Sequence, residues 1–123
     1  MKNNNVLVDK SFQFAIRTVK LYKYLCEDKK EFILSKQLLR AGTSIGANIN
    51  ESQDAQSKND FVSKLSISLK EGRESKYWLE LLKETDYLTN KEAESILNDL
   101  EEVIKLLVSI IKTTKENIKN ESK

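Results

Sequence analysis

The sequence predicts an all-α protein that folds as an antiparallel, up-down-up-down four-helix bundle. Apolar residues recur every three or four positions in four successive stretches, which is the period of an amphipathic helix. The chain has no proline and only three glycines, so it lacks the turn residues that a many-stranded β fold needs. Short polar segments separate the four stretches, and helices with short connections pack as antiparallel neighbours. With 123 residues and no linker, we expect a single domain over residues 1–123.

We expect the first helix from about Asp9 to Glu27, where a polar run ends it. Its broadest apolar arc predicts the core-facing residues Phe12, Ala15, Ile16, Val19, Tyr22 and Cys26. A second apolar stripe lies about 120° away around the helix, at Phe14, Leu21 and Leu25. Three apolar residues in line on an outer face predict an oligomer interface. The alternative is that this helix buries a wide arc in its own core.

The second helix is expected from about Glu31 to Asp54. Its core stripe is predicted to be Leu34, Leu38, Ala41, Ile45 and Ile49. Glycine inside a helix costs roughly 1 kcal/mol relative to alanine, so it indicates close backbone approach. Gly42 and Gly46, with Gly72 further along the chain, therefore predict a tight crossing of the second and third helices.

The third helix is expected from about Asp60 to Tyr87, and the fourth from about Thr89 to Asn117. Thr89 and Glu92 have the spacing of a capping box, which predicts where the fourth helix starts. The core stripe of the third helix is predicted to be Phe61, Leu65, Ser68, Gly72, Ser75, Leu79 and Leu82. That of the fourth is predicted to be Ala93, Ile96, Leu97, Leu100, Val103, Ile104, Leu107, Ile111 and Ile118. The two ends, about 1–8 and 118–123, are expected to fray.

Polar residues form a lateral stripe on the second helix, and acidic residues form a similar one on the third. These stripes comprise Gln37, Arg40, Ser44, Asn48 and Glu51, then Glu71 and Glu74. One interpretation is a network that sets helix register, in which Arg40 pairs with Glu71 or Glu74. A second is that the stripe lines a binding groove or a channel between subunits. A third is a carboxylate magnesium site made by Glu51, Glu71 and Glu74, although no histidine is available to complete a di-iron motif.

Basic residues are concentrated in the first third of the chain. The formal net charge is only +2, but residues 1–40 carry nine basic and four acidic side chains. Such a patch could hold phosphates without reading base sequence. The candidate nucleic-acid contacts are Lys10, Arg17, Lys20, Lys23, Lys29, Lys30 and Lys36. The alternative is an ordinary solvated, lysine-rich surface.

The residue inventory argues against most enzymes. The chain has no histidine and a single cysteine, Cys26, which excludes disulfide frameworks and histidine-based acid–base catalysis. We therefore expect no catalytic residue, no cofactor and no structural metal. No apolar stretch is long enough to cross a membrane, and no signal-peptide h-region is present, so we expect a cytoplasmic protein.

The stretch Gln37–Glu51 resembles the signature of the bacterial 23S rRNA intervening-sequence proteins, the S23 family. The segments Lys64–Glu71 and Glu74–Leu82 resemble the third helix of that family, and the likeness extends from about Phe12 to Ile111. Ser52 departs from it, since many members have glycine there. The resemblance implies a four-helix bundle that assembles into a homopentamer in the bacterial cytoplasm. The retroelement accessory variability protein, a basic pentamer that works with a reverse transcriptase, is similar in fold.

The family's biochemical role is not established, so the resemblance supplies no catalytic residues. Together with the charge pattern, it leads us to expect a non-enzymatic homo-oligomer that binds RNA or a ribonucleoprotein through its first helix. A nucleic-acid-processing protein is a further possible partner. We expect no membrane partner. The alternative is a protein-interaction scaffold without nucleic-acid binding, in which the stripe of Phe14, Leu21 and Leu25 docks a different protein.

Overall fold

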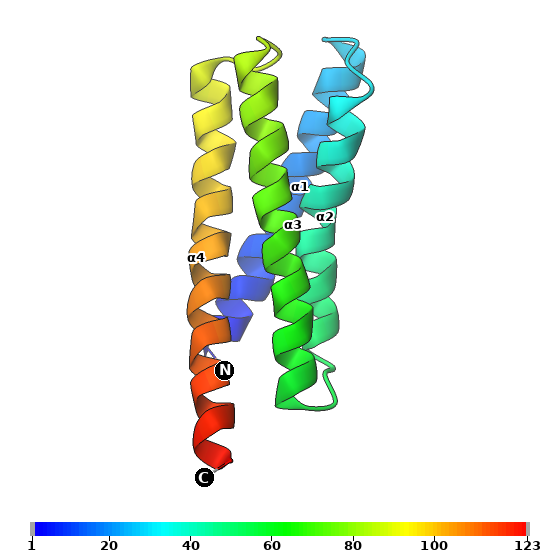
Figure 1. Ribbon diagram of the computed structural model, residues 1–123. Helices are drawn as coiled ribbons and strands as arrows, with labels where there is room; N and C mark the ends of the chain where they lie inside the picture. The colour runs from blue at the N-terminus through cyan, green and yellow to red at the C-terminus, as the bar shows by residue number, and fades with distance from the viewer. Residues whose placement is uncertain (1, 123) are drawn as a thin grey trace.

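The computed structural model describes residues 2–122, with side chains described from residue 5 onward, and it contains four helices. They are α1 (Lys2–Glu27), α2 (Leu34–Ser52), α3 (Lys58–Glu84) and α4 (Asn90–Glu121). Each helix packs against the next along the chain, and α4 also packs against α1 (Figure 1). Residues 2–122 include no β-strand. The predicted antiparallel four-helix bundle is confirmed.

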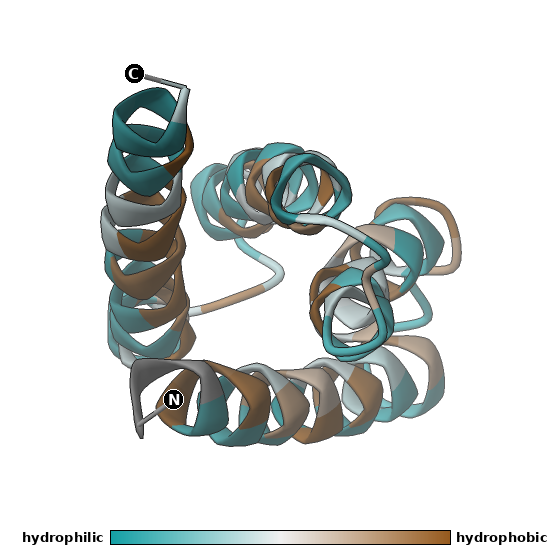
Figure 2. Cartoon of the chain, turned by 90° about the horizontal axis from the view of Figure 1, so that it is seen from below, coloured by the Kyte–Doolittle hydropathy of each residue, from teal (hydrophilic) through white to brown (hydrophobic). Residues whose placement is uncertain are grey.

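The first helix is inclined to the rest of the bundle. Its N-terminal half lies beside α4, whereas its C-terminal end lies beside α2 (Figures 1 and 2). The space between α1 and α4 therefore widens toward the end of the bundle where α4 begins. This divergence has consequences for the surface that the first helix presents.

Each of the last three helices begins at a recognisable cap. Thr89 and Glu92 form the predicted capping box. The nitrogen of Thr89 lies 2.8 Å from Glu92 Oε1, and the nitrogen of Glu92 lies 3.1 Å from Thr89 Oγ1. The Ser57 hydroxyl accepts from the N–H of Asp60 at 3.0 Å and caps α3. At α2, the carboxylate of Glu31 lies ahead of the helix and accepts from its first free N–H groups. Glu31 is therefore a cap and not the first helical residue, which corrects the predicted start of α2.

The first helix begins at Lys2 and not at Asp9, because Leu7 is a core residue that the expected frayed segment had excluded. Leu7 lies one heptad before Phe14 and is 1% exposed, so its burial stabilises an additional N-terminal turn. At the other end of the chain, α4 continues to Glu121, beyond the expected Asn117. Fraying of the outermost residues stays a prediction.

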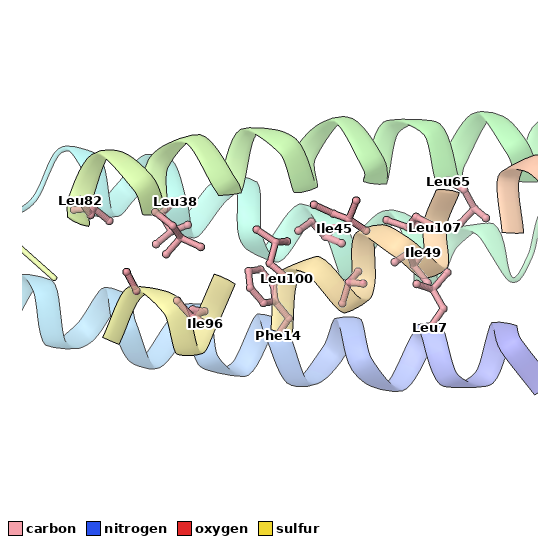
Figure 3. Packing of buried hydrophobic residues seen from close by; sticks show 14 of the residues in the cluster. Leu7, Phe14, Leu38, Ile45, Ile49, Leu65, Leu82, Ile96, Leu100 and Leu107 are labelled. Atoms are coloured by element: carbon pink, nitrogen blue, oxygen red, sulfur yellow. The ribbon is translucent and has the colours of Figure 1, made fainter. Parts of the chain in front are cut away.

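The face that α1 turns toward the core is the second apolar stripe, about 120° around the helix from the arc predicted to be buried. Phe14 and Leu25 are 1% and 0% exposed, whereas Phe12 is 63% exposed. Figure 3 shows Leu7 and Phe14 directed from α1 into the interior, with Phe14 beside Leu100. The core seam of α1 is Leu7, Ser11, Phe14, Thr18, Leu21 and Leu25, at alternating steps of four and three. Phe14 and Leu25 therefore belong to the core and Leu21 is half-buried against it, so the prediction of this stripe as an oligomer interface is wrong.

Two hydroxyl residues explain why the seam does not look apolar in the sequence. Ser11 and Thr18 are buried, and each donates to a carbonyl of its own helix, Val8 O at 3.0 Å and Phe14 O at 2.9 Å. Their small side chains face the two glycines of α2. A Cβ added to Gly42 would lie 2.7 Å from Thr18 Cγ2, and one added to Gly46 would lie 3.4 Å from Ser11 O. Gly42 and Gly46 thus permit close approach to α1, not to α3 as predicted.

The core stripes predicted for α2, α3 and α4 are largely confirmed. Leu38, Ile45, Leu65, Leu79 and most of the apolar residues expected of α4 are buried. The Ser68 hydroxyl of α3 donates to Ile45 O of α2 at 2.9 Å, so these helices also approach closely. No helix within residues 2–122 has both the length and the apolar character needed to span a bilayer.

Candidate nucleic-acid interface

The seven basic residues predicted to contact nucleic acid do not form one uniform patch. They divide into two residues that are paired with α4 and five whose ammonium groups are free of carboxylates among residues 5–122. Lys10 and Arg17 make up the first group. The second group consists of Lys20, Lys23, Lys29, Lys30 and Lys36.

Lys10 and Arg17 attach the first helix to the fourth. Lys10 Nζ lies 2.7 Å from Glu102 Oε2, and the hydrogen bond from this ammonium to the carboxylate raises the pKa of Lys10. Arg17 donates to Asp99 Oδ2 at 2.6 Å and also to the carbonyl and hydroxyl oxygens of Ser95. These two cations are already paired with carboxylates of α4, so they are not free to bind phosphates.

The five free lysines lie on the second half of α1, on its connection to α2 and on the first turn of α2. All five are exposed. Lys29 lies over the ring of Tyr24, with its Nζ 5.9 Å from the ring centroid, within the range of a cation–π contact. This end of the bundle therefore presents five exposed lysines, with the exposed acids Glu27 and Asp28 in the same segment.

A groove of about 490 Å³ opens where α1 diverges from α4. Leu21 and Tyr24 line it from α1, and Leu88 and Ile96 line it from the fourth helix and the connection before it. Among the side chains of residues 5–122, Lys20 and Lys91 are its cations without a carboxylate at ion-pair distance, one on each helix, since Arg17 at the same groove is held by Asp99. Lys91 was not among the predicted contacts, because it is distant in sequence and lies in a segment that is acidic overall.

The polar stripe lies on the surface between α2 and α3. Arg40 donates to Glu71 at 3.0 Å and also to Glu74, while its own side chain is 52% exposed. The Ser44 hydroxyl donates to Arg40 O at 2.6 Å, and the Asn48 amide donates to Ser44 O at 2.8 Å. Arg40 thus bridges the two carboxylates of α3 across the helix pair, which is the arrangement expected of a register-setting network.

The other members of the predicted stripe are more loosely engaged. Glu51 lies 4.0 Å from Lys64, and Gln37 is exposed at the surface. Glu71 and Glu74 are both paired with the guanidinium of Arg40. In the part of the chain that the structure describes, no group of three metal-ligating side chains comes together.

Because α1 buries its second stripe, the apolar arc predicted for the core lies partly on the outside. Phe12 is 63% exposed and Val19 is 37% exposed. Phe12 also lines a groove of about 380 Å³ between α1 and α2, with small residues on the α2 side. Its lining consists of Val8, Ser11, Phe12, Ala15, Thr43, Gly46, Ala47 and Asn50. An exposed apolar surface of this kind is typical of a protein–protein contact.

Comparisons with known proteins support the likeness seen in the sequence. The family model of the 23S rRNA-intervening sequence proteins matches residues 3–109. A crystal structure of a protein of unknown function from Bacteroides thetaiotaomicron, ascribed to the S23 ribosomal protein family, is 58% identical. Its alignment covers 89% of this chain and 98% of that one, with a TM-score of 0.89. The comparison with curated proteins gives no match.

Proposed function

Since the chain belongs to the 23S rRNA-intervening sequence protein family, we propose that it is a non-enzymatic homo-oligomer that binds RNA through the basic surface of α1. The observation that carries the proposal is the group of five lysines on and after α1 whose charges no carboxylate neutralises among residues 5–122. Lysines without partners contact phosphates at little cost, because no protein ion pair has to be broken first.

The α1–α4 groove adds a feature that suits single-stranded RNA. Lys20 and Lys91 flank a surface that includes the ring of Tyr24 and the side chain of Leu21. Unpaired bases stack on aromatic and apolar side chains, while cations beside them bind the phosphates. The groove volume of about 490 Å³ is within the range of small-ligand sites and can take a single nucleotide.

The test is charge reversal at Lys20 and Lys23, measured as RNA affinity by fluorescence anisotropy with a 20-nucleotide single strand. Arg17 is unsuitable, because reversing it would place a carboxylate against Asp99. The control is reversal at Lys70 and Lys115, which are also exposed and lie outside both the α1 surface and the groove. We expect RNA affinity to fall at least tenfold in the variant with Lys20 and Lys23 reversed and much less in the control variant. Equal losses would remove the α1 surface from the proposal.

We further propose that the oligomer forms through the outer face of α1, which carries Phe12 and Val19. We also propose that this oligomer is a pentameric ring in the cytoplasm, as the family resemblance implies. Native mass spectrometry of a Phe12→Ser, Val19→Ser variant tests it, with Ile33→Ser as the control at an exposed apolar residue outside α1. Loss of the oligomer in the double variant alone is the expected outcome.

The same exposed face favours one second candidate, a scaffold that docks a different protein without binding nucleic acid. Under that function the double variant keeps its oligomeric mass, and the wild-type protein purified without nuclease carries no RNase-sensitive mass. Under the first function, nucleic acid copurifies with the wild type and absorbs at 260 nm.

A further inference from the structure

A second groove, of about 530 Å³, runs between α3 and α4 and collects basic residues that are far apart in sequence. Arg73 and Lys76 contribute to it from α3, and Lys105 and Lys112 from α4. Its lining is completed by Glu101, Ile104, Val108 and Ser109. None of its members is among the residues predicted to contact nucleic acid.

Close packing of the two helices brings these cations together. Gly72 lies against α4, where an added Cβ would be 3.3 Å from Ile104 Cγ1. Ile104 is 8% exposed and Val108 is 43% exposed, so the apolar part of the groove continues from the core to the surface. Arg73 and Lys76 follow Gly72 within about one helical turn, which places them beside the lysines of α4.

The groove has an uncompensated positive charge. It has four cations and one carboxylate, that of Glu101, and hence a formal net charge of +3. Within residues 5–122, none of the four cations lies within ion-pair distance of a carboxylate. Gathering like charges in one hollow is unfavourable in the isolated protein, and a bound polyanion would relieve that repulsion.

We propose that the α3–α4 groove is a second nucleic-acid contact that binds the phosphodiester backbone. Lys105 and Lys112 are seven residues apart on one helix, or about 10 Å along its axis, which matches about three successive phosphates of a strand. Lysine and arginine at the groove bind phosphates whatever the bases are, so this contact adds affinity without sequence preference. The inference takes its ligand class from the proposed function, but the site is separate and shares only α4 with the α1 surface.

Two double variants of equal charge test the groove. Lys76→Gln with Lys105→Gln removes one cation from each side of it, and Lys70→Gln with Lys115→Gln removes one exposed lysine from each of the same helices outside it. Lys20→Gln with Lys23→Gln reports on the α1 surface. Affinity is measured by anisotropy from 50 to 300 mM salt with a 20-nucleotide single-stranded RNA, a 20-base-pair DNA duplex and polyglutamate.

We expect the groove variant to bind the nucleic acids at least fivefold more weakly and to reduce the slope of log K against log salt by about 2. The control variant should retain most of the affinity and slope. Equal losses in both variants, or tighter binding of polyglutamate than of either nucleic acid through the same lysines, would overturn the proposal. The nucleic acid that the groove prefers is the probe, RNA or DNA, whose affinity falls more in the groove variant.

The two proposals fail separately. If the groove variant is impaired and the α1 variant is not, the α1 surface is refuted and the groove stands. If only the α1 variant is impaired, the groove is refuted. Absence of nucleic-acid binding by the wild-type protein refutes both.

Discussion

The carboxylate of Glu31 provides a direct test of how α2 is held in place. Glu31 is 7% exposed, and it accepts from the N–H groups of Ile33 and Leu34 at 3.0 Å and from that of Ser35 at 2.6 Å. The residue at the N-cap position, Ile33, has no side chain that could do this. Three donors at the N-terminus of the helix therefore depend on one buried acid.

The magnitude follows from these contacts. Losing an N-cap side chain costs about 0.5–2 kcal/mol, and the three charge-assisted hydrogen bonds here favour the upper end or slightly beyond it. We expect Glu31→Ala to lower the free energy of unfolding by about 2–3 kcal/mol. Glu31→Gln retains a carbonyl oxygen but loses the charge that interacts with the helix dipole, so a loss of about 1 kcal/mol is expected.

The effect should depend on pH in a defined direction. Burial tends to raise the pKa of Glu31, but hydrogen bonds from the N–H groups of Leu34, Ser35 and Ile33 outweigh it and hold the pKa below its ordinary value. The folded state thus binds the proton more weakly than the unfolded state, whose glutamates titrate at about pH 4.3. The stabilisation is complete above that pH and is lost as the pH falls through the lower, folded-state pKa.

Urea unfolding at pH 7 and at pH 3, at one fixed protomer concentration, measures both effects. Glu94→Gln is the matched control, since Glu94 is exposed on α4 and makes no ion pair among the described residues. The loss of unfolding free energy in Glu31→Gln, relative to wild type, should be smaller at pH 3 than at pH 7. The loss in Glu94→Gln should stay near zero at both. A deficit under about 0.3 kcal/mol at pH 7, or one unchanged in acid, would refute the capping argument.

Two further pairs of substitutions test the orientation of α1 and its packing on α2. Phe14→Ala should cost about 3–5 kcal/mol in urea unfolding because it empties a core site, whereas Phe12→Ala at its 63% exposed position should cost under about 1 kcal/mol. The reverse order would mean that the predicted face was right after all. Gly42→Ala should cost about 1–3 kcal/mol, since its Cβ would meet Thr18 at 2.7 Å, and Thr18→Ala should recover part of that loss. Gly46→Ala, with a nearest contact of 3.4 Å, should be neutral or raise the melting temperature, and a loss as large as at Gly42 would contradict the packing described.

The second, third and fourth helices were predictable because each has one apolar stripe. The step from Leu38 to Ile45 to Ile49 leaves α2 a single way to face a core, and the capping box at Thr89 sets the start of α4. The first helix has two apolar arcs, and periodicity favoured the broader one, although the narrower one is buried. The choice depends on Ser11 and Thr18, whose buried hydroxyls appear polar in the sequence.

The candidate site was predictable only in part. The excess of lysine on and after the first helix is visible in the sequence, but the pairing of Lys10 and Arg17 with α4 is not. Nor does the sequence show that Lys91 lies across a groove from Lys20, or that Lys76 lies beside Lys105. Charge counted along the chain averages over residues that the fold separates, and misses those that it brings together.

The sequence by itself determined the helical class, the number of helices, their order and the core of three of them. These features depend on local spacing, because an amphipathic stripe and a cap each lie within one helix. The tertiary structure alone decided which arc of α1 is buried, which lysines remain unpaired and where grooves open. Those outcomes depend on complementary shapes and charges on different helices, such as Thr18 against Gly42 and Arg17 against Asp99. The sequence of one helix does not specify which other helix each of its side chains will contact.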